Sequence, residues 1–314
     1  MAQSTPSFTP AWRQTVTLAQ AFAYKTEDIK KFVDDVADHA GDIWAATGNV
    51  GDAINLARAA QDLSAALWKP EVKKDGEGKP IPPPEPKGPP LTTVLYPTDL
   101  QDDRLLFDWN GIKIRSTTIY DTLAYVLSVT GYLPQEPQNP VRDYYLPLAA
   151  VYANWCYKLG VELKDSTGTF NYHISWFDSK IAARPGRKVL LGSTIGKNQQ
   201  FRDDIKNARA AVLKGLGYTV PPPAQDKSQN FGGCCETSFF IYAKQADPIE
   251  NSASGFALYL DDFTNPERET YNVAKWAAQI RNPCAQSCQK LFGQIGWKGN
   301  STFKADVHKK SALS

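Results

Sequence analysis

The chain has few cysteines for its length, which limits the chemistry they can serve. Five occur among 314 residues, and an odd, small number argues against a disulfide framework. No run of about 18 apolar residues occurs, so we expect no membrane-spanning helix. The N-terminus lacks a basic segment followed by an apolar run, so we expect an intracellular protein, cytoplasmic or nuclear, without a signal peptide. Thiolate chemistry and metal binding remain open.

The chain also lacks a marked excess of basic over acidic residues, or of acidic over basic ones. Lys and Arg number 35 and Asp and Glu number 33, so the formal net charge is +2. This balance excludes the strongly basic composition that would by itself indicate nucleic-acid binding. The C-terminal part differs, because eight basic residues and only three acidic ones follow residue 263. A polyanion could be held there.

The pattern along the chain predicts three parts. Residues 1–68 carry apolar residues at helical spacing and are expected to form a helical accessory hairpin, which could bind a protein partner. Residues 69–91 are so rich in proline and glycine that they indicate a linker. Residues 92–314 predict a helix-rich α/β unit.

Within that unit, several short segments carry recognisable signals. Asn110 and Gly111 lie between apolar runs and predict a tight hairpin turn. Pro147 is expected to kink the early part of a long aromatic helix. The other expected elements are strands at 170–177, 188–193 and 255–260, a helix at 201–217, a helix at 269–280 and a candidate strand at 301–307.

Four of the five cysteines fall in two tight clusters. Cys234 is followed by Cys235 and Glu236, and about fifty residues later Pro283 precedes Cys284, with Cys288 four residues further on. A catalytic zinc ion typically takes three protein ligands and keeps a fourth position for water. Cys234, Cys284 and Cys288 supply three sulfur ligands. Glu236 would then lie near the metal without binding it, which is the place of a general acid or base.

This arrangement resembles the zinc-dependent cytidine deaminase-like superfamily, with a looser likeness to its fungal-looking branch. The family signature is [H/C]-x-E followed by P-C-x-x-C. Here it is C-x-E at 234–236 and P-C-x3-C at 283–288, so the resemblance spans about 232–292 with one extra residue in the second motif. It implies a three-layer αβα core at about 188–314 behind a helical N-terminal extension. The strand pair that precedes the first motif in the family would have to come from further upstream, from 170–177 and 188–193, with the helix at 201–217 inserted.

The resemblance also implies a mechanism. Zinc lowers the pKa of bound water from about 15.7 to near 7, so that hydroxide can attack C4 of cytosine or C6 of adenine. Glu236 would pass the proton to the ring nitrogen and then to the leaving amine. Three thiolates weaken the Lewis acidity of zinc, and two helix N-termini together with a hydrogen bond from Arg281 to a thiolate are expected to compensate.

The substrate is less well defined by the sequence. Cytosine in single-stranded DNA or RNA is favoured over a free nucleoside or nucleotide, and cytosine over adenine, with the basic C-terminal part as the only support. Phe239, Tyr259 and Trp297 could stack on an unpaired base, although each is equally consistent with a core position.

Other interpretations of the cysteines stay open. Cys234 and Cys235 could be small buried side chains, and Cys284 and Cys288 a disulfide. A structural zinc site needs a fourth ligand, which Cys235 or His308 could supply, and the protein would then be a non-catalytic interaction module. A cysteine hydrolase needs a histidine beside its nucleophile, and the chain offers only His39, His173 and His308.

Overall fold

The computed structural model describes most of the chain. The described residues are 16–46, 53–67, 106–109, 111–131, 137–162, 171–177, 188–195, 199–219, 231–246, 253–260, 270–284, 287–295 and 303–314. The predicted linker at 69–91 lies outside them. The helices are α2 (Leu18–Phe22), α3 (Thr26–Asp38), α4 (Ala40–Ala46), α5 (Ala53–Leu67), α6 (Ile119–Thr130), the π-helix η3 (Val141–Tyr145), α7 (Leu146–Glu162), α8 (Gln199–Gly215), α9 (Thr237–Gln245), α10 (Val273–Ala278), α11 (Cys288–Gln294) and α12 (Ala305–Leu313).

The strands form two sheets, so the predicted mixture of helix and sheet is confirmed. They are β1 (Leu106–Trp109), β2 (Ile112–Arg115), β3 (Asn171–Phe177), β4 (Lys188–Ser193), β5 (Ala253–Tyr259) and β6 (Ile280–Arg281). The larger sheet has the order β4-β3-β5-β6, and every pairing in it is antiparallel. The smaller sheet is the β1–β2 hairpin that Asn110 and Gly111 predict, and Gly111 has φ +83°.

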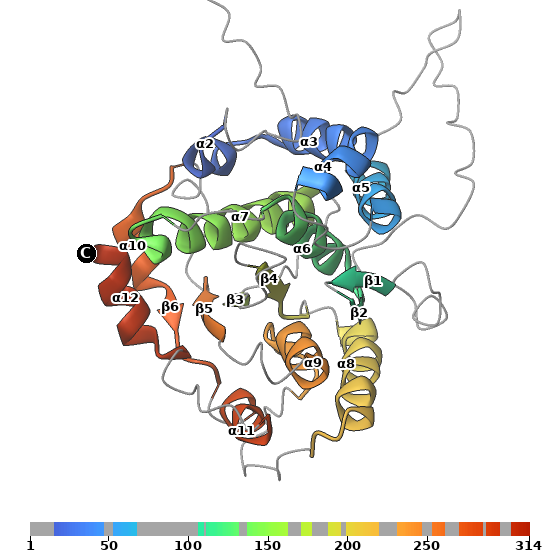
Figure 1. Ribbon diagram of the computed structural model, residues 1–314, viewed down its shortest axis with the longest axis vertical. Coiled ribbons are helices and arrows are strands. Elements are labelled where there is room, and N and C mark those ends of the chain that lie inside the picture. Colours follow the sequence, from blue (N-terminus) through green and yellow to red (C-terminus); the bar gives the residue numbers. More distant parts are fainter. Residues whose placement is uncertain are drawn as a thin grey trace, which may run out of the picture.

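Side chains of β3 alternate between two helical layers, as a fully buried strand requires. Tyr172 contacts Tyr152 of α7, whereas Phe177 stacks on Phe239 of α9. Figure 1 shows α6 and α7 along one face of the larger sheet and α9 on the other. The sheet is therefore enclosed between helices, and the strands at 170–177 and 188–193 pair directly, with α8 following them as expected.

The front helices pack onto the rest of the protein. Helices α3 and α5 form the expected hairpin, α5 contacts α6, and α2 contacts α7. The Asn154 side chain donates to the carbonyl of Phe22 at 2.6 Å, and the Trp155 indole donates to the carbonyl of Ala21 at 2.9 Å. Their buried residues join one continuous hydrophobic core with those of α6 and α7. Binding of a further protein by these helices stays a prediction.

Pro147 affects the chain where the sequence predicts a kink. The preceding residues form the π-helix η3, and α7 continues from Leu146. Proline cannot donate a backbone hydrogen bond, so the helix needs a local change of its bonding pattern near this residue. The change seen next to Pro147 is thus a single turn of π-helix, and the kink itself stays a prediction.

The strand predicted at 301–307 is wrong for the described part of that range, because α12 begins at Ala305. Ala305, His308 and Ala312 are buried at helical spacing, and α12 contacts β5 and β6 with this face. Residues 301–307 suggest a strand because a segment this short holds too few apolar residues to distinguish the 3.6-residue repeat of a helix from the two-residue repeat of a strand. Among the described residues, no helix is both long and apolar enough to span a membrane.

Candidate metal centre

The turn that carries the first cysteines is held by close backbone contacts. Gly232 has φ +83°, and a Cβ there would lie 2.4 Å from the carbonyl oxygen of Lys206 on α8. A Cβ on Gly192 of β4 would lie 2.4 Å from the carbonyl oxygen of Cys235. Only glycine permits both the left-handed backbone and such approaches. The sequence thus fixes the turn between α8 and β4.

Helix α9 begins directly after this turn. The Thr237 hydroxyl donates to the carbonyl of Cys234 at 2.7 Å, and the Thr237 N–H donates to the same oxygen at 3.2 Å. Cys234 and Glu236 are therefore held beside the first turn of α9, where the unpaired backbone N–H groups favour negative charge.

The second pair of cysteines follows the edge strand β6. Cys284 lies in the loop after β6, and Cys288 is the first residue of α11. The Gln289 side chain donates to the carbonyl of Pro283 at 2.9 Å, and the Gln289 N–H donates to the carbonyl of Cys284 at 3.1 Å. These bonds hold the loop against the start of α11.

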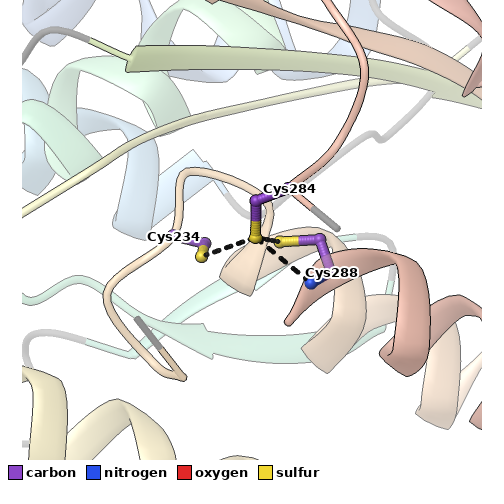
Figure 2. Close-up of side chains that lie close together, drawn as sticks. All are labelled: Cys234, Cys284 and Cys288. Carbon is purple, nitrogen blue, oxygen red and sulfur yellow. Dashed lines mark hydrogen bonds between the residues drawn. The ribbon is translucent and has the colours of Figure 1, made fainter. Parts of the chain in front are cut away.

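The three sulfur atoms meet, as Figure 2 shows. Cys284 Sγ lies 3.7 Å from Cys234 Sγ and 3.3 Å from Cys288 Sγ, and all three atoms lie within 4.8 Å of one another. A tetrahedral ion with metal–sulfur bonds of about 2.3 Å requires sulfur separations of about 3.8 Å. The three cysteines are positioned to hold one metal ion.

Glu236 lies against this cluster and is buried. Its Oε2 accepts hydrogen bonds from the Cys288 thiol and from the Cys235 thiol, each at 3.3 Å. Burial, and then the nearby Cys284 charge, raise the pKa of the Glu236 carboxyl. A carboxyl group with a raised pKa beside a metal position is suited to receive and return a proton.

Cys284 makes hydrogen bonds with both other sulfurs of the cluster. The bond with Cys234 and then the bond with Cys288 lower the pKa of Cys284, and the Cys288 N–H donates to its sulfur at 3.3 Å. Cys284 is also the exposed member, whereas Cys234, Cys235 and Cys288 are buried. The cluster therefore reaches solvent on the Cys284 side.

A fourth protein ligand is not found among the described residues. The group of mutually close ligand atoms contains the three cysteines alone. His308 contacts Trp176 at 5.3 Å and Phe256 at 5.6 Å between ring centroids, on the face of β3 opposite α9. Cys235 directs its thiol to Glu236. Neither residue lies in the group of close ligand atoms within the described part of the chain.

Arg281 does not take the predicted position at a thiolate. Its guanidinium donates to the carbonyl of Ala278 at 2.5 Å and to that of Ile280 at 3.1 Å, and its side chain is exposed. In the described structure, the backbone N–H of Cys288 makes the bond to the Cys284 sulfur instead.

Sequence reasoning missed the part played by Cys235. The sequence offers it as a small buried side chain or as a fourth zinc ligand, whereas in the structure its thiol is one of two donors to the Glu236 carboxylate. Direct adjacency to an acid was the only available signal, and adjacency does not reveal side-chain direction. Comparison with protein-family models, with curated protein sequences and with solved structures finds no match to this chain.

Proposed function

We propose that this protein is a zinc-dependent deaminase that converts cytosine to uracil, with single-stranded DNA or RNA as the substrate. The observation that carries the proposal is the contact between a buried Glu236 and a three-cysteine cluster that lacks a fourth protein ligand among the described residues. The enclosed antiparallel sheet, with both motifs at the starts of helices, supports a deaminase-like core.

Zinc fits the donor set. Three thiolates in near-tetrahedral separation favour zinc over harder ions, which prefer oxygen ligands. Cys234, Cys284 and Cys288 would hold the ion. When bound, zinc acts as a Lewis acid that lowers the pKa of water to near neutrality.

The chain's own residues would handle the protons. Glu236 is close enough to the cluster to take one proton from the attacking water and give it to the ring nitrogen, and then to carry the second proton, from the hydroxyl that has added to the ring, to the departing amine. The overall reaction consumes one water and releases ammonia, so the carboxyl ends in its starting state. The thiol of Cys235, which is not a metal ligand in this scheme, donates to one of the carboxyl oxygens and orients the group before substrate arrives.

Exposed cations near the open side support a nucleic-acid substrate over a free nucleoside. Arg281 and Lys304 are both exposed. The side chain of Asn282 accepts a hydrogen bond from the N–H of Ala305 at 2.8 Å, which brings together the segments that carry the two cations, and Asn282 precedes Cys284 by two residues. Such cations can hold backbone phosphates, and this contribution weakens with salt.

The test is Glu236→Gln in the full chain. We expect deamination of cytosine in single-stranded DNA or RNA to fall by about 10²- to 10⁴-fold, because the general acid and base is lost. Bound metal and thermal stability should stay as in the unchanged protein. Asp306→Asn, which removes an exposed carboxylate on α12, is the matched control and should retain full activity.

The assay should cover cytosine and adenine in single-stranded DNA, duplex DNA, RNA and nucleosides. Activity of the metal-loaded protein that survives Glu236→Gln would contradict the assigned role. Absence of activity on every substrate, with zinc bound, would favour a non-catalytic zinc module.

A further inference from the structure

Cys284 is the exposed residue of the cluster. The other members, Cys234 and Cys288, and the neighbouring Cys235 are buried. An oxidant that diffuses to this site therefore meets Cys284 first. Cysteine oxidation follows accessibility and thiolate character, so exposure selects this residue within the cluster.

A second thiol lies within reach of the first. Cys288 Sγ is 3.3 Å from Cys284 Sγ, which is closer than Cys234 Sγ at 3.7 Å. The N–H of Cys288 also donates to the Cys284 sulfur at 3.3 Å and stabilises negative charge on it. The pair thus offers an accessible sulfur and an adjacent buried one, which is the arrangement of an attacking and a resolving cysteine.

We propose that Cys284 and Cys288 form a reversible thiol–disulfide pair that is oxidised by hydroperoxides and that controls whether the cluster can hold a metal ion. The Cys284 thiolate attacks an oxygen of hydrogen peroxide, the O–O bond breaks, and a sulfenic acid and hydroxide form; the hydroxide takes up the proton that the Cys284 thiol released and becomes water. The Cys288 sulfur then attacks the Cys284 sulfur, the S–S bond forms, and hydroxide leaves and gains the Cys288 proton. Two thiols lose two electrons, and one peroxide becomes two waters.

The disulfide would dismantle the site. Of the three ligand sulfurs only Cys234 would remain a thiol, and one thiolate does not retain zinc. Glu236 would also lose the hydrogen bond from Cys288. A thiol reductant would restore both. This switch does not depend on the deaminase activity, since it concerns the sulfurs alone.

The experiment treats the full, folded chain with a small molar excess of hydrogen peroxide, then blocks free thiols and digests with trypsin. Cleavage after Lys and Arg places Cys284 and Cys288 in peptide 282–290, and Cys234 and Cys235 in peptide 228–244. We expect peptide 282–290 to be lighter by two hydrogens and unblocked, with peptide 228–244 fully blocked. A chromogenic chelator should detect metal released in step with the disulfide, and dithiothreitol should reverse it.

Other products would overturn the proposal. These are a cross-link between the two peptides, a disulfide within peptide 228–244, overoxidised Cys284 without any disulfide, or retention of the metal after the disulfide has formed. Cys156→Ala serves as the control, because Cys156 lies in the core of α7 and should leave every readout unchanged. If the purified chain carries no metal, the peptide masses still decide whether the pair forms, independently of the proposed enzyme activity.

Discussion

Two buried polar clusters of this protein differ in how completely they are paired. In the first, Arg209 of α8 forms an ion pair with Asp121 of α6 at 2.6 Å and donates to the Thr117 hydroxyl at 2.7 Å and to the carbonyl of Ser193. Asp121 also accepts from the backbone N–H of Thr117 at 2.9 Å. Positive and negative charge balance, and each partner has several hydrogen bonds.

The second cluster contains Glu236 and the cysteines and has no such balance. Among the described residues, the Glu236 carboxylate accepts bonds from two thiols and forms no ion pair. A set of acidic groups buried together is unfavourable unless a cation joins them. The charges of Arg209 and Asp121 are thus neutralised within the protein, whereas the cysteine cluster is positioned to hold a metal ion.

The largest effect should come from removing one ligand. Cys234→Ala is expected to abolish metal binding, because two sulfurs cannot complete the site. The stability that bound metal provides, about 4 kcal/mol when free metal is a thousandfold above its dissociation constant, should disappear with it. Metal content and thermal unfolding with and without a chelator measure this. Cys156→Ala should bind metal normally, and equal metal loss in both variants would contradict the assignment.

The second largest effect should come from removing the ion pair between Arg209 and Asp121. Arg209→Met leaves Asp121 buried without its cation and should lower the free energy of unfolding by about 3–5 kcal/mol. Urea unfolding gives the value. The metal content of the folded fraction should not change. If Arg209→Met lost its metal but kept its free energy of unfolding, the assignment of a structural role to the Arg209–Asp121 pair would be wrong.

The smallest effect concerns His173, which is buried between Phe239 and Phe303. Burial lowers its pKa from 6.5 to about 3, and neither ring nitrogen has a hydrogen-bond partner among the described residues. Between these pH values the unfolded chain binds a proton that the folded chain does not, so stability falls as pH falls, by at most about 1.4 kcal/mol per pH unit.

His173→Phe should remove this part of the pH dependence and leave the fold intact, because the aromatic contacts are kept. Unfolding should be measured from pH 6.5 to 4.5 for both proteins, and the difference between their slopes isolates His173 from carboxyl groups such as Glu236, whose raised pKa is common to both. If the free energy of unfolding of His173→Phe had the same slope against pH as that of the unchanged protein, His173 would have to be protonated, or hydrogen-bonded, in the folded state.

Much of the candidate site follows from the sequence because it depends on spacing. A proline before Cys284 and an acid two residues after Cys234 indicate the starts of two helices, and the thiols do converge. The directions of Arg281 and Cys235 do not follow, because each side chain takes one of several rotamers and bonds to a sequence neighbour, Arg281 to the carbonyls of Ala278 and Ile280 and Cys235 to Glu236, and residue spacing does not select among rotamers. The bonds of the front helices to α7 do not follow either, because they join residues more than 130 positions apart.

The attachment of α2 to α7 bears on how the protein can be shortened. Asn154 and Trp155 are buried donors whose acceptors are the carbonyls of Phe22 and Ala21. A version starting after residue 24 would leave both buried donors without acceptors, which should lower the free energy of unfolding by about 1–3 kcal/mol for each. It would also expose the apolar side of α7 to solvent. Such a truncation should aggregate, so an inactive fragment of this kind would say nothing about catalysis.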